Sequence, residues 1–210
     1  MNNKKHLLVI AILTITISTF AQVKDIDNNV YQTIVLNKIT WTAENLNVNR
    51  FRNGDTIPEA KTYEEWEKAS SKKQPAWCYY DNNPQEGKIY GKLYNRYAVT
   101  DLRGIAPEGW HVAQSEDWLS CIVNYYGQES SKILKAKNGW NSEGNGTNKS
   151  GFTGLPGGYR DNDGIFNDVG YNGYWWSTSS WYYFLRYNTK KIEMVNSYGN
   201  YGMSIRCVKD

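Results

Sequence analysis

Residues 139–173 constrain the fold of this chain most, because they hold ten of its eighteen glycines. Asn and Asp stand between many of these glycines, and both residue types tolerate the left-handed backbone of tight turns. The stretch therefore predicts a long loop region. A loop of this length inside a compact domain is uncommon unless it carries function, so we expect candidate binding loops within residues 138–183.

Segments rich in β-branched and aromatic residues lie on both sides of this loop region. Residues 30–36 and 39–42 predict the opening strands, and residues 174–178 and 181–187 predict two aromatic strands after the loops. In residues 203–208, Met, Ile and Cys alternate with Ser, Arg and Val, which is typical of a strand with one buried face.

Two short helices have recognisable start signals. Thr62 and Glu65 have the spacing of a capping box, in which each side chain bonds the backbone N–H of the other residue. Ser115 is expected to cap a second helix, on which Trp118 and Cys121 share one buried face.

The N-terminus has the pattern of a secretory signal peptide. Two lysines precede an apolar run of eleven residues over 7–17, and small residues surround a cut before Gln22. A membrane span needs about 20 apolar residues, so this run predicts a leader and no transmembrane span. We expect a signal peptide over 1–21 and a single mature domain over 22–210, secreted or held at the cell surface or in the periplasm; the alternative is an uncleaved signal anchor.

The charge of the chain argues against a nucleic-acid partner. It has 24 Lys and Arg residues against 21 Asp and Glu residues, and two of the lysines belong to the leader. The mature chain is therefore close to neutral, and it has no basic run of the kind that binds phosphate backbones.

Nine stretches of the chain match one known family. The first reads Trp-Thr-Ala-Glu-Asn-Leu-Asn, and all nine, in order, are 41–47, 52–55, 75–80, 90–95, 106–112, 150–152, 155–160, 173–178 and 204–210. By these stretches the chain resembles the Fibrobacter succinogenes major paralogous domain family of exported bacterial proteins. One departure is Ala113, where that family usually has Pro before the helix.

That family in turn resembles the C-type-lectin-like fold, in the branch shared with sulfatase-modifying factors. Residues 110–112 leading into 115–118 are similar to the strand-to-helix signature of this branch, and residues 204–208 are similar to its final strand. The resemblance implies an α+β fold with two short helices, a small twisted antiparallel sheet and a long Gly-rich loop region. It implies a binding scaffold only by analogy.

The residues do not favour catalysis. His111 is the single histidine of the mature chain, so a His-based triad or a multi-histidine metal site is excluded. The sulfatase-modifying enzymes use a close pair of cysteines near the C-terminus, whereas Cys207 stands alone in its region. No carboxylate pair is fixed by spacing for glycosidase chemistry. We expect no enzyme and no cofactor.

Asp161, Asn162 and Asp163, which precede Gly164, admit two interpretations. Their oxygens could bind calcium, or the stretch could be a turn, because these residue types tolerate left-handed backbone. The motifs Glu-Pro-Asn, Gln-Pro-Asp and Trp-Asn-Asp of calcium-dependent lectins are absent from the sequence. We therefore predict no metal site.

Three cysteines in an exported chain leave at least one unpaired. Cys121 lies on an apolar helix face and is expected to be a buried free thiol. Cys78 and Cys207 both fall in stretches that match the family, and we expect them to form a disulfide; the alternative is three reduced, packed cysteines.

These features favour an exported, non-catalytic binding module that presents loops to a glycan or a surface protein. The alternatives are a structural or cell-surface interaction protein without a small ligand and, third, an enzyme related to sulfatase-modifying factors. Exposed aromatic rings and directional polar groups suit such ligands. The candidate ligand-binding residues are Tyr159, Arg160, Asp161, Asp163, Asn167, Asp168, Trp176, Trp181 and Tyr183.

Overall fold

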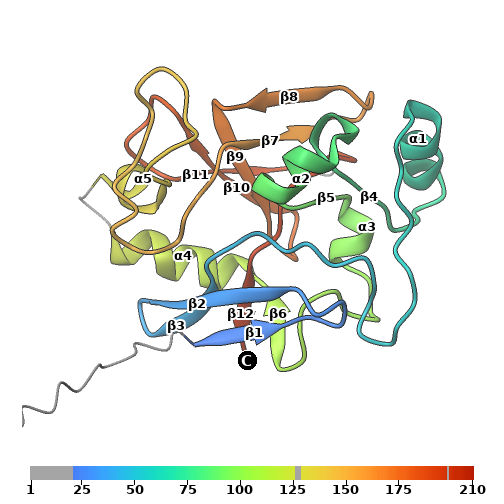
Figure 1. The fold of residues 1–210 in the computed structure, drawn as a ribbon, viewed down its shortest axis with the longest axis horizontal. Helices are drawn as coiled ribbons and strands as arrows, with labels where there is room; N and C mark the ends of the chain where they lie inside the picture. The colour runs from blue at the N-terminus through green and yellow to red at the C-terminus, as the bar shows by residue number, and fades with distance from the viewer. Residues whose placement is uncertain (1–20, 126–128, 198) are drawn as a thin grey trace, which may run out of the picture.

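The computed structural model describes residues 21–125, 129–197 and 199–210 (Figure 1). The expected signal peptide, residues 1–21, lies outside the described residues except for Ala21. The described residues form twelve strands in three sheets, together with five α-helices and one short 3-10 helix. None of these helices is long and apolar enough to cross a membrane.

The first sheet gathers strands from both ends of the chain: β1 (Gln22–Lys24), β2 (Val30–Leu36), β3 (Ile39–Thr42), β6 (Trp110–Val112) and β12 (Cys207–Lys209). Their order is β1-β2-β3-β12-β6, and all neighbours are antiparallel. The hairpin β2–β3 turns over Asn37 and Lys38, which both have positive φ angles. A two-residue turn of this kind matches the twist of the strands that it joins.

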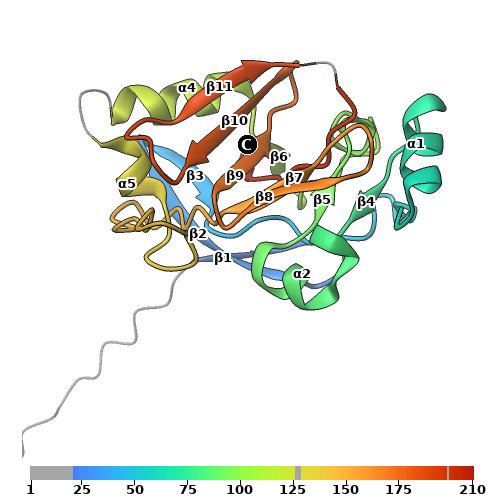
Figure 2. The same ribbon diagram turned by 90° about the horizontal axis from the view of Figure 1, so that it is seen from above.

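The second sheet lies above the first in Figure 1 and is formed by β7 (Gly157–Arg160), β8 (Phe166–Val169), β9 (Asn172–Trp176), β10 (Trp181–Arg186) and β11 (Glu193–Asn196). Its order is β11-β10-β9-β7-β8. All pairs are antiparallel except β7 with β9. Figure 2 shows β9, β10 and β11 side by side.

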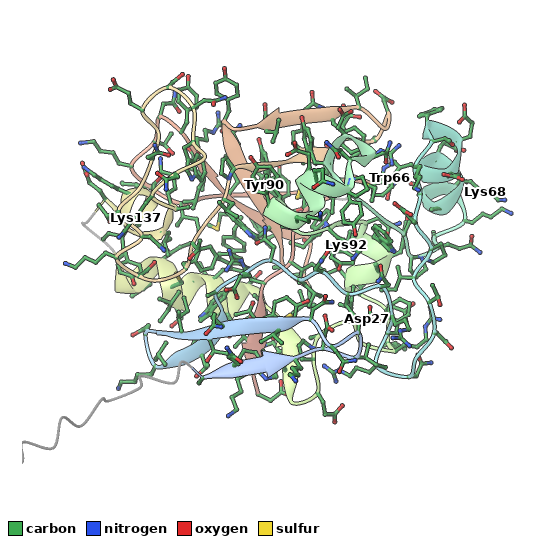
Figure 3. All side chains as sticks on the ribbon, in the orientation of Figure 1. Asp27, Trp66, Lys68, Tyr90, Lys92 and Lys137 are labelled. Carbon is green, nitrogen blue, oxygen red and sulfur yellow. The ribbon has the colours of Figure 1, made fainter. Side chains whose placement is uncertain are left out.

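The helices and a small third sheet cover the sides of these two sheets: α1 (Tyr63–Ser71), α2 (Pro84–Tyr90), α3 (Arg96–Val99), α4 (Ser115–Asn124), α5 (Ser130–Leu134), the 3-10 helix η1 (Tyr80–Asn82), β4 (Trp77–Cys78) and β5 (Leu93–Tyr94). The capping box of α1 is confirmed: Glu65 donates its N–H to the Thr62 hydroxyl at 3.1 Å, and Thr62 donates its N–H to the Glu65 carboxylate at 2.9 Å. Figure 3 shows Trp66 pointing inward from α1 and Lys68 pointing away from the molecule.

Helix α4 lies between the two sheets on one side of the molecule (Figure 1). It begins at Ser115, so the cap is Gln114 and not Ser115 as expected. The N–H of Gln114 donates to the Asp117 carboxylate at 2.8 Å. Trp118 and Cys121 are buried on one face of the helix, as the spacing predicted.

The expected fold class, a C-type-lectin-like α+β fold of two short helices and a small sheet, is wrong. The described chain is mostly β, with two five-stranded sheets and a two-stranded one. Much of the difference lies in the Gly-rich stretch 139–173, which was expected to be loop and contains β7, β8 and the first two residues of β9. A Cβ on Gly158 would lie 2.3 Å from the Asn167 carbonyl oxygen, so glycine here permits close strand approach.

The segment 203–208 is buried on both sides, whereas the alternation of its residues predicted one buried face. Ser204 and Arg206 are 2% and 0% exposed. The reason is that the segment runs from one sheet to the other. Ser204 forms a bridge with Trp175 of the second sheet, and β12 then pairs with β3 and β6 of the first.

The expected disulfide is not formed: all three cysteines are free and buried. Cys78 packs in a cluster around Trp66, whereas Cys207 packs in a different cluster with Tyr94 and Ile205. Their positions in separate parts of the core explain why they do not pair. Cys121 is a buried free thiol, as expected.

Candidate functional site

Strands β9 and β10 divide their aromatic side chains between the two faces of the second sheet. Alternation, together with the pairing of Tyr174 opposite Phe184, places these two rings and that of Tyr182 on one face. Trp175 and Tyr183 point to the other face, where they pack in the core with residues of α4. The first face is the one on which tyrosines keep part of their surface exposed.

Four half-buried tyrosines meet on this side and are called the tyrosine face: Tyr159 of β7, Tyr174 of β9, Tyr182 of β10 and Tyr201 from the segment before β12. The ring centroid of Tyr159 is 4.9 Å from that of Tyr174 and 5.8 Å from that of Tyr201. Tyr182 lies 6.0 Å from Tyr174 and 6.3 Å from Tyr201. All four contacts are edge-to-face, which is a favoured geometry for aromatic pairs.

Polar groups with free hydrogen-bonding capacity border the rings. Asp168 Oδ2 accepts the Tyr174 hydroxyl at 2.6 Å and the Asn172 side-chain amide at 2.8 Å. Within the part of the chain that the structure describes, Asp168 Oδ1 and the other three hydroxyls of the tyrosine face have no protein partner. The face therefore combines partly exposed rings with three hydroxyl groups and one carboxylate oxygen that the described residues leave unpaired.

The hydroxyls of Tyr159, Tyr174 and Tyr182 stay protonated over the ordinary pH range. Burial raises the pKa of Tyr174, and the hydrogen bond to the Asp168 carboxylate raises it further. Burial also raises the pKa of Tyr159 and Tyr182. A neutral phenol can both donate and accept a hydrogen bond, so each free hydroxyl can serve a ligand in either role.

Two of the residues predicted for the site, Tyr159 and Asp168, belong to this surface. Asp161, Asp163 and Asn167 lie together at the adjoining turn between β7 and β8. Asp161 Oδ1 accepts the N–H of Asp163 at 3.0 Å, and its Oδ2 accepts the Asn167 amide at 3.0 Å. The structure thus brings five of the nine predicted residues to one end of the second sheet.

The other four predicted residues do not line this surface. Arg160, Trp176 and Tyr183 are each at most 1% exposed, so they belong to the core and not to a binding surface. The indole N–H of Trp176 donates to the Tyr94 carbonyl at 2.8 Å. Trp181 is half-buried and packs with the core cluster on the α4 side of the sheet.

The stretch of Asp161 to Gly164 is a turn. Asp161 Oδ1 accepts the N–H groups of both Asp163 and Ile165, and Gly164 has a φ of 76°. Carboxylate oxygens that close a turn in this way are engaged by their own backbone. Among the described residues, no group of three or more His, Cys, Asp or Glu side chains is arranged to hold a metal ion.

Sequence reasoning missed Tyr174, Tyr201 and Asn172. Strand alternation could have identified Tyr174. Neighbouring side chains on a strand point to opposite faces of the sheet, so the side chain of Tyr174 points away from that of Trp175. No local signal indicated Tyr201. It joins the face only because the segment before β12 returns to the second sheet, where Gly202 forms a bridge with Arg160.

The fold and the tyrosine face define a β-rich protein with an aromatic surface on one sheet. The chain belongs to the family described as the Fibrobacter succinogenes major domain, whose model matches residues 34–209. No curated protein and no solved structure matches the chain. The resemblance to this family is therefore confirmed, whereas the finer resemblance to the sulfatase-modifying branch has no support from these comparisons.

Proposed function

We propose that the chain is an exported, non-catalytic binding module whose tyrosine face holds a glycan. The observation that carries the proposal is the set of four half-buried tyrosines, three of them with hydroxyls that have no partner among the described residues. A tyrosine ring offers an apolar surface to sugar C–H groups, and its hydroxyl bonds the sugar hydroxyls. Ring contacts hold the rings in place before any ligand binds, which lowers the entropic cost of binding.

The state of the nucleophilic residues supports a non-catalytic role. Burial raises the pKa of Cys78 and Cys121 to about 12 and raises that of Cys207 further, so none is a ready thiolate. The two ring nitrogens of His111 lie 2.7 Å from the Asp210 carboxylate and 3.1 Å from that of Asp117. Both nitrogens of this histidine are therefore engaged in fixing the C-terminus and the start of α4.

Export is part of the proposal and rests on the leader pattern of residues 1–21. The mature protein is then secreted or held at the cell surface or in the periplasm. N-terminal sequencing of the native protein should begin at or near Gln22. An intact leader on protein from the cytoplasm would contradict this part of the proposal.

Glycan binding is tested with purified protein on a glycan array, followed by calorimetry with the best ligand. Tyr182→Ala and Tyr201→Ala should each weaken binding by about 2 kcal/mol, as buried aromatic anchors do. Tyr171→Ala is the matched control, since this tyrosine is 44% exposed and lies outside the tyrosine face. Unchanged affinity in both test variants, with the control also unchanged, would contradict the proposal.

A second candidate, binding of a surface protein, is favoured by one observation. Strand β11 lies at the edge of the second sheet and exposes Met194 and Val195 at 46% and 38%. Exposed apolar side chains on an edge strand are typical of interaction surfaces. Met194→Lys should abolish such an interaction and leave glycan binding intact, so this variant separates the two functions.

A further inference from the structure

Two carboxylates, those of Asp168 and Asp161, lie close enough to the tyrosine face to act on the ring of Tyr159. Asp168 lies at one end of the face, where its Oδ2 accepts the Tyr174 hydroxyl. Asp161 follows β7 directly, and both carboxylates add to the effect of burial in raising the pKa of Tyr159. Both negative charges therefore act on the same ring surface.

Arg186 of β10 is a cation close to the face, and its charge opposes the effect of burial on the pKa of Tyr182. Arg186 lies over the ring of Phe184, with its guanidinium carbon 5.0 Å from the ring centroid. Its Nε forms an ion pair with Glu193 at 2.8 Å, so its charge is balanced by a carboxylate on the neighbouring strand. The ion pair of Arg186 and Glu193 therefore offers no unbalanced positive charge to an anionic ligand on the face. Asp168 and Asp161 would repel such a ligand.

Asp168 also has a carboxylate oxygen that the described residues leave unpaired. Its Oδ2 is held by Tyr174 and Asn172, which fixes the carboxylate, whereas Oδ1 has no partner among the described residues. A carboxylate oxygen accepts hydrogen bonds and cannot donate them. It matches a sugar hydroxyl, and it repels a sugar carboxylate or sulfate.

We propose that the tyrosine face selects neutral glycans and rejects acidic ones, and that Asp168 is the residue that determines this specificity. The inference rests on the proposed function, because it names the class of glycan that the same face takes. The Asp168 carboxylate attracts one kind of group and repels another. Its Oδ1 accepts a hydrogen bond from a sugar hydroxyl, and its negative charge repels an anionic group. Discrimination of this kind combines an attractive contact with a repulsive one.

The chain offers a close variant for the test. Asp168 has a φ of 67°, a left-handed conformation that Asn adopts as readily as Asp. Asp168→Asn therefore removes the charge and keeps the size and the backbone of the residue. Asp163→Asn is the matched control, because Asp163 is exposed at the tip of the turn and does not contact the tyrosine face.

The experiment is calorimetry with pairs of oligosaccharides of equal linkage and length, one member with a C6 hydroxymethyl group and the other with a C6 carboxylate. The wild type should bind the neutral member about tenfold more tightly at low salt, the size expected for one uncompensated charge near a surface. Asp168→Asn should reduce this preference to about threefold or less, whereas Asp163→Asn should keep it. High salt should narrow the preference of the wild type, because ions screen the repulsion.

Equal or tighter binding of the acidic member by the wild type would overturn the inference and leave the proposed function standing. A preference that does not change with salt would also overturn it, and this measurement needs no variant. If neither member of any pair binds, the proposed function fails and the inference fails with it. Melting curves of both Asn variants establish that each is folded.

Discussion

At the scale of single residues, Asn45 joins the two sheets. Its Oδ1 accepts the Trp175 indole N–H and the Arg206 Nε–H, each at 2.8 Å. Its Nδ2 donates to the Tyr90 carbonyl at 2.8 Å and to the Ser204 hydroxyl at 3.1 Å. All hydrogen-bonding groups of this 7%-exposed side chain, which follows β3 of the first sheet, are thus in use, and they reach β9 of the second sheet, α2 and the segment before β12.

Asn45→Ala should lower the free energy of unfolding by about 3 kcal/mol, because two buried donors lose their acceptor. Urea titration with tryptophan fluorescence measures this change. Asn188→Ala is the control, since Asn188 is exposed and lies in a connection after β10. Equal stability of the two variants would show that the hydrogen bonds of Asn45 are not what holds the sheets together.

At the scale of elements, Arg160 fastens the β7–β8 hairpin to the start of α1. Its Nη1 donates to the Ala60 carbonyl at 2.6 Å, and its Nη2 donates to those of Lys61 and Thr62 at 3.1 and 3.0 Å. Its Nε donates to the Gly164 carbonyl at 3.0 Å. This buried guanidinium therefore replaces water for four carbonyl oxygens, one of which, that of Thr62, also accepts the Trp66 N–H of α1 at 3.1 Å.

Arg160→Met keeps most of the side-chain volume and removes all four of these hydrogen bonds. The free energy of unfolding should fall by about 3 kcal/mol or more, since hydrogen bonds to a charged group are among the stronger ones. Amide hydrogen exchange should increase in both the β7–β8 turn and α1. The control is Arg186→Met, at an exposed arginine of the same sheet. It should leave the amide protection of both regions unchanged. Loss of protection in the hairpin alone would contradict the proposed link to α1.

Local sequence signals identified some elements with the correct bounds. The strands over 30–36 and 39–42 are confirmed as β2 and β3, and the Thr62 capping box is confirmed at α1. Each of these depends on residues close in sequence, which propensity and capping describe well. Short α2, α3 and α5 were missed because helices of seven residues or fewer carry little periodicity.

Contacts between residues far apart in the sequence account for the parts of the fold and of the site that the sequence did not predict. Trp176 and Tyr183 were candidate surface residues, yet both are buried because the segment before β12 and helix α4 cover them. The glycines of β7 suggested a loop, whereas they allow Tyr80 and Tyr90 to pack closely on that strand. The tyrosine face needs residues from β7, β9, β10 and the segment before β12, and no single short window of sequence contains it.

At the scale of the whole molecule, buried titratable groups make stability depend on pH. Burial lowers the pKa of Lys92 and Lys135 to about 8 from a usual value of 10.5. Lys92 donates to the carbonyl and side-chain oxygens of Asn47 at 2.6 and 2.9 Å, bonds that a neutral amine can also make. Figure 3 shows Lys92 in the interior of the molecule.

The sign of each contribution follows from which state holds more protons. Between pH 8 and 10.5 the unfolded lysines stay protonated while the folded ones are neutral, so stability rises with pH. The three cysteines act in the opposite sense. Their folded pKa values lie above the usual 9.0, so stability falls once pH exceeds that value. Tyrosines with raised pKa values add to this fall above pH 10.

The free energy of unfolding should therefore rise by about 1–2 kcal/mol from pH 7 to a maximum near pH 9, then fall. Urea titrations at unit steps of pH, with a reductant to keep the thiols free, measure this profile. Lys92→Met should remove about half of the lysine contribution to the rise, because Lys92 and Lys135 have similar folded pKa values. Lys191→Met, at an exposed lysine, should leave the profile unchanged. A flat or falling profile between pH 7 and 9 in the wild type would show that both lysines stay charged in the folded protein, held by their hydrogen bonds and by the nearby rings of Trp77 and Trp140.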